Sequence, residues 1–523
     1  MAISVDRAAR PESPAVYAQL EEKILERDQQ GASQIYYDLV RAGRPLPELL
    51  GQIVRIHAPY THVPYHQRLD NGIVRFVNND HCLLSSRAST DLMKRIRSEL
   101  AWLPLAQTIW YVPTGLDPWN QLLGKMPGHY VRLYELKFEG KPPLPQVHWA
   151  DQEPLPIDGP FPEKLNAWLT LVQRGEVVQA YRVFLGLWEE ALPDAAKRTQ
   201  LLGQLVFAGL IDVQDRMLHN RSYTTGHKSY RARATVQLAQ AVGWANARSI
   251  LYAGVPDMAV GPRWHSTYEM GCLVIQNFLE ARDQDFLGND GALSSVESIA
   301  LIEALLSGEE PTFIELLVGL IKAGKGLRQI IDTIQIASAQ VILETGHPNN
   351  FSMSQHSYEY CNTVRWFFDT FEHPHRLKLL FVAAAFVHRA AYHQRHTPEN
   401  GPTKIEAPRG ADALSQDEML RRLNDALVSL RADEAVNWTA AYLKAGFDRA
   451  ALVETLAGGS AKTGNDPHNQ ELGVCLLEDY AHSTAPDRDR LLLASAKHTA
   501  GHRKYGDHME AYRRFAEAFD LAT

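Results

Sequence analysis

The stretch Leu316-Leu-Val-Gly-Leu-Ile-Lys-Ala-Gly324 carries the pattern that decides the fold. It is an apolar helix end closed by Ala-Gly, and apolar residues at helical spacing resume at Leu327, Ile330 and Ile331. Glycine suits the left-handed conformation just past a helix terminus, so the stretch predicts two helices joined by a tight turn. Three further stretches follow the same plan: Tyr36–Gly43, Leu201–Gly209 and Thr439–Gly446. The sequence therefore predicts a mainly α fold of repeated helical hairpins packed as a large array; the alternative is chance recurrence of Ala-Gly at helix ends.

One region departs from helical periodicity. Ile73–Val77, Thr108–Val112 and Tyr130–Phe138 are rich in β-branched and aromatic residues, which favour strands. We therefore expect a small β-containing insertion near residues 70–150. Proline-rich and polar breaks elsewhere divide the chain into four expected units: an N-terminal helical hairpin (1–69), the insertion (70–150), a central helical domain (163–396) and a C-terminal helical domain (413–523).

The composition and net charge exclude several classes of protein. The 523 residues are 45% hydrophobic and 22% charged with a net charge of −8, which argues against disorder and against general nucleic-acid binding. The longest apolar run, Leu379–Val387, is far shorter than the roughly 20 residues of a membrane span, and the N-terminus lacks the apolar segment of a secretory signal. Four scattered cysteines without a CxxC pair exclude a disulfide scaffold. We expect a cytoplasmic protein that binds a small-molecule substrate but no nucleic acid and no membrane; a homo-oligomer is compatible with the sequence.

Histidine is unusually frequent, with 21 residues in the chain. One histidine follows each Ala-Gly by 18 to 23 residues, and the four are His62, His227, His347 and His468. If the hairpins pack around a pseudo-symmetric centre, these side chains converge, and imidazole groups suit zinc, copper or iron. We therefore predict the four as metal ligands. The alternative is that each one caps a helix or fills a turn by hydrogen bonding.

Two local pairings suggest acid–base or ligand chemistry. His62 and His66 are four residues apart and would share one face of a helix. His356 and Glu359 are one turn apart at the start of an apolar helix, where the carboxylate can ligate a metal or orient a general base. Together with His227, these four residues are the predicted catalytic groups.

Two other histidine-containing segments allow a structural interpretation; for Val77–His81 a functional role stays open as well. Val77–His81 has the composition of a polar turn after a strand, and His498 and His502 lie beside Arg503 and Lys504, which favours a basic helix that faces solvent. The sequence contains no GxSxG, Walker A or GxGxxG motif in a suitable context. These absences argue against a serine hydrolase, a P-loop enzyme and a Rossmann dehydrogenase.

The helical hairpins that end in Ala-Gly and the histidines that follow them resemble the questin oxidase-like family. The segments that carry the resemblance are Phe207–Gly209 with Thr225–His227, Lys322–Gly324 with Gln355–His356, and Leu377–Ala385. The resemblance implies oxidation of an aromatic polyketide-type or other cyclic ketone, with ring opening and use of NADPH. The expected insertion at 70–150 departs from the family pattern.

Three functions remain open at this point. The first is a monooxygenase-like oxidoreductase that acts on a cyclic or aromatic small molecule in a histidine-lined helical cavity. The second is a metal- or haem-dependent enzyme or binding protein, with iron or haem held by the repeated histidines. The third is a non-catalytic helical solenoid that binds a partner. A closed, histidine-lined cavity would argue against the third.

Overall fold

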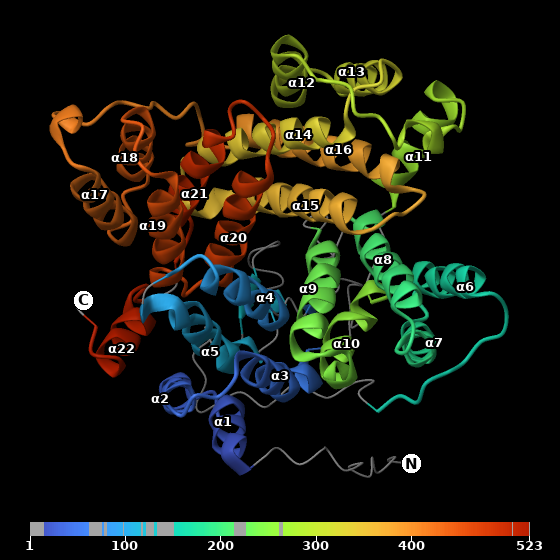
Figure 1. The fold of residues 1–523 in the computed structure, drawn as a ribbon, viewed down its shortest axis with the longest axis horizontal. Coiled ribbons are helices and arrows are strands. Elements are labelled where there is room, and N and C mark those ends of the chain that lie inside the picture. Colours follow the sequence, from blue (N-terminus) through green and yellow to red (C-terminus); the bar gives the residue numbers. More distant parts are fainter. Residues whose placement is uncertain are drawn as a thin grey trace.

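The computed structural model describes residues 15–61, 76–77, 81–97, 99–116, 119–121, 130–132, 151–213, 226–260, 265–504 and 506–521. These residues form 22 α-helices, which Figure 1 shows in their spatial arrangement. None of the helices within this described part combines the length and the apolar character that crossing a bilayer would require. The prediction of a mainly α fold is confirmed.

The helices follow one another with short connections. The first third of the chain contains α1 (Ala15–Leu25), α2 (Gln29–Arg41), α3 (Leu46–His57), α4 (Cys82–Met93) and α5 (Leu103–Gly115). The middle contains α6 (Phe161–Arg174), α7 (Val177–Ala191), α8 (Ala195–Ile211), α9 (His227–Val242), α10 (Arg248–Gly254), α11 (Ser266–Phe278), α12 (Ser295–Ser307), α13 (Glu310–Lys322), α14 (Leu327–Leu343), α15 (Phe351–Thr370) and α16 (Arg376–Arg395). The last part contains α17 (Gln416–Val428), α18 (Ala432–Lys444), α19 (Arg449–Lys462), α20 (Pro467–His482), α21 (Asp489–Gly501) and α22 (Glu510–Ala518). Short 3-10 turns lie at Ala58–Tyr60, Glu99–Trp102, Trp244–Asn246, Pro256–Met258, Asp283–Phe286, Pro348–Asn350 and Ala411–Ala413.

Three of the four predicted Ala-Gly helix ends are confirmed. Gly43, Gly324 and Gly446 follow α2, α13 and α18 with φ of +71°, +74° and +73°, the left-handed region that glycine tolerates best. The prediction for Gly209 is wrong, because this residue lies inside α8. A Cβ there would lie 2.6 Å from the backbone oxygen of Lys228, so Gly209 permits close packing of α8 on α9 instead of ending a helix. Local helix ends of this kind do not by themselves establish a repeated packing of the hairpins.

The predicted β-containing insertion is not supported as a unit. Thr108–Val112, expected to be a strand, lies within α5, which begins at a proline-containing first turn and is buried on almost every face. A short apolar run that is buried all round has no periodicity by which helix and strand can be told apart, and this is why the prediction failed. The β structure of the described residues near 70–150 is limited to β1 (Phe76–Val77), β2 (Trp119–Gln121) and β3 (Tyr130–Arg132), paired antiparallel in that order.

Four helices that are far apart in the sequence meet near the centre of the molecule. Figure 1 shows α4 in blue, α9 in green, α15 in orange-yellow and α20 in red around this region. Each of α4 and α15 packs against both α9 and α20, so the four helices form a closed ring of contacts. Their buried residues include many polar and charged side chains, which must find partners because burial without a partner is costly.

Candidate functional site

The ring of α4, α9, α15 and α20 brings four histidines together. His81, His227, His356 and His468 come one from each helix or its cap. Ring centroids are 4.4 Å apart for His81 and His468, 5.2 Å for His81 and His227, 4.6 Å for His227 and His356, and 5.4 Å for His356 and His468. We call these four residues the histidine cluster. All four side chains are largely buried, and the most exposed of them, His468, has 15% of its side-chain surface accessible. A surface ion pair therefore does not explain the cluster.

Helix ends place three of the four rings. His227 is the first residue of α9, directly after Gly226, whose φ of +73° turns the chain into the helix. His81 caps α4, and its backbone N–H donates to the Tyr111 hydroxyl at 3.1 Å. His468 lies in the first turn of α20, after a proline that is pre-organised for a helix start. Side chains at helix starts project from the ends of the helices, so helices from distant parts of the chain can direct them to one point.

Three ring nitrogens, one each from His81, His227 and His468, lie within 4.8 Å of one another. Nε2 of His468 is buried and makes no hydrogen bond within the described part of the chain. Its Nδ1 lies 2.8 Å from Oδ1 of Asp466, the residue that also caps α20 by accepting from the His468 backbone N–H at 3.0 Å. A carboxylate behind one ring nitrogen and an unpartnered nitrogen on the other side is the arrangement of a metal-ligating histidine.

Two buried carboxyl groups border the histidine cluster. Glu471 lies one turn after His468, and its Oε2 is 2.8 Å from Nδ1 of His81. Glu359 lies one turn after His356; its Oε2 is buried without a hydrogen-bond partner among the described residues. A cavity of about 20 Å³ touches both carboxyl groups, which is room for about one water molecule.

Burial shifts the pKa values of the carboxyl groups and imidazoles around the histidine cluster. Burial raises the pKa of Glu359 to about 7 and that of Glu471 well above its usual value, so both carboxyl groups hold protons more strongly than exposed ones. Burial likewise lowers the pKa of His356 well below its usual value, which keeps this ring neutral at neutral pH. Burial would also lower the pKa of His468, but the Asp466 carboxylate outweighs it and raises that pKa to about 9.

A second histidine pair extends the site toward α21. His502 lies 5.7 Å from His468 between ring centroids, and His498 lies 4.8 Å from His502. The side-chain atoms of Asp466, His468 and His502 form a second group within metal-ligand range, which shares His468 with the first. Lys504 donates to Oδ1 of Asn469 at 2.6 Å. The predicted solvent-facing helix is therefore wrong for His498 and His502, because both residues are buried.

Behind the histidines, a network of buried charges ties the same four helices together. The carboxylate of Glu478 on α20 accepts hydrogen bonds from Arg233 of α9 at 2.7 and 2.8 Å. It also lies 3.0 Å from a guanidinium nitrogen of Arg365 on α15 and 3.3 Å from one of Arg87 on α4. Asp479 accepts from Arg365 at 2.8 Å. These contacts hold α20, and with it His468 and its neighbours, in register with the other three helices.

The structure brings together some of the residues predicted from the sequence but not all of them. His227, His356, Glu359 and His468 lie in or beside the histidine cluster. His347 does not: its side chain is 42% exposed, and its Nδ1 accepts from the backbone N–H of Asn349 in a turn before α15. His347 therefore follows the alternative of a turn-filling histidine. His62 and His66 lie outside the described residues, so their predicted roles stay predictions.

Sequence reasoning missed three residues of the site. The sequence leaves His81 open between a functional loop and an ordinary polar turn, and it does not single out Glu471 or Asp466. One signal was available, because His468 and Glu471 repeat the spacing of His356 and Glu359. Two copies of the same spacing on two apolar helices are a stronger indication of a shared site than either copy alone.

No protein-family model, curated protein or solved structure matches the chain. The resemblance to the questin oxidase-like family therefore stays a prediction, and the chemistry of the site rests on its geometry.

Proposed function

We propose that this chain is a metal-dependent enzyme in which His81, His227 and His468 bind one transition-metal ion. The observation that carries the proposal is the convergence of three imidazole nitrogens within 4.8 Å, two from buried and one from a largely buried histidine, with an acidic side chain behind two of the rings. Imidazole ligands favour iron, zinc, copper or nickel over magnesium or calcium. The cavity beside the carboxyl pair has a volume of about 20 Å³, which is room for about one water molecule.

The residues around the ion would orient its ligands and exchange protons with a bound molecule. Asp466 and Glu471 would orient the rings of His468 and His81, which fixes the nitrogen that each ring offers to the metal. Glu359 would exchange a proton with a bound substrate or water, because its Oε2 is buried, unpartnered and beside the cluster. His356 would supply a neutral ring nitrogen at the same place. When bound, the metal ion would supply Lewis-acid or redox chemistry.

The reaction class that we propose is the oxidation of a cyclic or aromatic small molecule. It rests on the resemblance stated above, since the geometry alone supports a metal site without naming the substrate. NADPH use belongs to the same resemblance. The third function, a non-catalytic solenoid, is disfavoured because such a protein has no need to bury several charged groups and imidazoles around one point.

Metal analysis of two variants tests the proposal. Purified wild-type protein should retain about one equivalent of a transition metal, or take it up from Fe²⁺ or Zn²⁺ added one at a time. His468→Ala should lose the metal, whereas His347→Ala should keep it, because His347 is partly exposed and outside the cluster. Elemental analysis and the visible spectrum measure the outcome without requiring a known substrate. A wild-type protein that binds neither ion, or equal metal loss in both variants, would contradict the proposal.

A further inference from the structure

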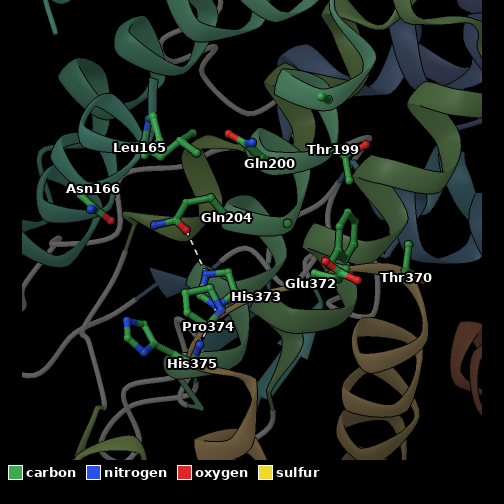
Figure 2. Close-up of a pocket in the computed structure, with 14 residues that line it drawn as sticks. Leu165, Asn166, Thr199, Gln200, Gln204, Thr370, Glu372, His373, Pro374 and His375 are labelled. Carbon is green, nitrogen blue, oxygen red and sulfur yellow. Dashed lines mark hydrogen bonds between the residues drawn. The ribbon is translucent and has the colours of Figure 1, made fainter. Parts of the chain in front are cut away.

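A second cavity lies away from the histidine cluster, between α6, α8 and the connection from α15 to α16 (Figure 2). Its volume is about 680 Å³, within the range of roughly 300–1,000 Å³ that is usual for small-molecule sites. Helix α15 runs from His356 in the cluster to Thr370 at the cavity, which at 1.5 Å per residue is about 21 Å. The cavity is therefore a separate site and not an extension of the proposed metal centre.

Uncharged hydrogen-bonding groups dominate the lining of this cavity. Asn166 of α6 and Gln200 and Gln204 of α8 contribute three primary amides, and Thr199 adds a hydroxyl group. Figure 2 shows these side chains around one opening. The lining includes no lysine or arginine among the described residues, and its one charged side chain is the carboxylate of Glu372. Such a lining matches an uncharged ligand and leaves a phosphate or carboxylate without a counter-charge.

One of the three amides, that of Gln204, is held in place before any ligand binds. Nε2 of His373 donates to Oε1 of Gln204 at 3.1 Å, the contact drawn as a dashed line in Figure 2. The Gln204 amide nitrogen lies on the side of Asn166 in that view. The His373 ring also stacks on Phe207, with centroids 4.1 Å apart and planes 25° apart. Burial lowers the pKa of His373 to about 3, so the ring stays neutral and adds no positive charge to the cavity.

One aromatic side chain, Phe371, contributes to the lining. The Phe371 ring borders the cavity and lies against Gly203 of α8, where a Cβ would come within 3.1 Å of the ring. Glycine at this position therefore lets the aromatic ring approach the helix backbone. An aromatic side chain beside primary amides suits a ligand with a planar ring and polar groups on its edge.

We propose that this cavity binds an uncharged heteroaromatic molecule whose edge presents a hydrogen-bond donor next to an acceptor, as the base of a nucleoside does. A primary amide offers a donor and an acceptor side by side, which is why asparagine and glutamine pair with such edges in two hydrogen bonds. Asn166 and Gln200 each offer such a pair, and Gln204, whose oxygen accepts from His373, adds an amide donor. The Glu372 carboxylate and the lack of lysine and arginine in the described lining favour the nucleoside over the corresponding nucleotide.

Titration calorimetry with adenosine as the probe tests the inference, with adenosine monophosphate as the charged comparison. Adenosine should bind the full-length protein, and the monophosphate should bind at least tenfold more weakly. Thr199→Trp should abolish adenosine binding, because this exposed residue of the rim would fill the cavity with an indole ring. Gln200→Trp, at a second exposed rim position, should do the same. The matched control is Thr312→Trp, which places the same side chain at an exposed position of α13 outside the cavity and should leave binding unchanged.

Failure of adenosine, inosine and uridine to bind at millimolar concentration would overturn the inference. So would binding that survives both rim variants, or binding of the monophosphate that is as tight as that of adenosine. The thermal midpoint and metal content of each variant should equal those of the wild type. Because the cavity is separate from the histidine cluster, failure of this proposal would leave the proposed metal site untouched, and the reverse also holds.

Discussion

Replacing Glu478 by glutamine tests whether the buried charge network holds the four central helices together. The carboxylate is shared among Arg233, Arg365 and Arg87, which come from three different helices. Glutamine keeps the size of the side chain and one carbonyl acceptor but removes the negative charge. Asp479 would then be the main buried acid left beside the guanidinium groups.

The expected loss of stability is large. The side chains of Arg233 and Arg365 are 1% and 2% exposed, so water cannot replace the missing charge. Removing one partner of a buried ion pair typically costs about 3–5 kcal/mol, because a buried charge is left uncompensated. The amide carbonyl and Asp479 can still accept hydrogen bonds from the guanidinium groups. We therefore expect a loss of stability near the lower end of this range, about 3 kcal/mol. That is a substantial part of the roughly 5–15 kcal/mol by which folded proteins are usually stable.

The loss should depend on pH with a defined sign. Burial alone would raise the pKa of Glu478, but the guanidinium groups of Arg233, Arg365 and Arg87 outweigh it and hold this pKa well below its usual value. A carboxyl group with a depressed pKa in the folded state contributes its stability above the unfolded value, about 4.3, and loses it as the pH falls through the folded value. The difference between wild type and Glu478→Gln should therefore be complete at pH 7 and shrink below about pH 4.

Urea unfolding followed by circular dichroism at pH 7 and pH 3.5 measures both effects. Glu303→Gln, at an exposed position of α12, is the matched control and should change the free energy of unfolding by less than about 0.5 kcal/mol. A Glu478→Gln protein as stable as this control at pH 7, or a difference that grows in acid, would refute the reasoning. Since the network fixes α20, we also expect the variant to retain less metal than the wild type.

Two further substitutions probe the site and the packing beneath it. Asp466→Asn should keep the helix cap, because asparagine caps as well as aspartate, but it should weaken metal binding about 10- to 100-fold through loss of the charge behind His468. Competition with a chromogenic chelator measures this, and Asp448→Asn, a helix cap without a histidine, should not alter it. Gly209→Ala should lower the free energy of unfolding by about 1–3 kcal/mol because its Cβ would lie 2.6 Å from a backbone oxygen of α9. Gly458→Ala, where nothing lies within 4 Å, should raise it by about 0.5–1 kcal/mol; a Gly209→Ala protein as stable as this control would contradict the packing argument.

Much of the local structure could be predicted because it depends on neighbouring residues. Apolar spacing indicated the helices, and Ala-Gly correctly indicated the ends of α2, α13 and α18. Several of the failures concern residues that are buried where the local sequence suggests otherwise. Thr108–Val112 was expected to be a strand because a helix buried all round shows no apolar stripe. His498 and His502 were placed on a solvent-facing helix because nearby basic residues suggested exposure, yet both are buried.

The sequence by itself determined the helical class, three of the four predicted Ala-Gly helix ends and the abundance of histidine. It also indicated His227, His356, Glu359 and His468 as candidate catalytic or ligand residues. Only the tertiary structure decided which histidines share one site. His81 and Glu471 are separated by 390 positions and yet lie 2.8 Å apart. His347, which follows its Ala-Gly at about the same distance as His468 does, lies partly exposed in a turn. The physical reason is that spacing along the chain governs hydrogen bonds within a helix, while the meeting of helix ends depends on how apolar faces pack across the whole molecule.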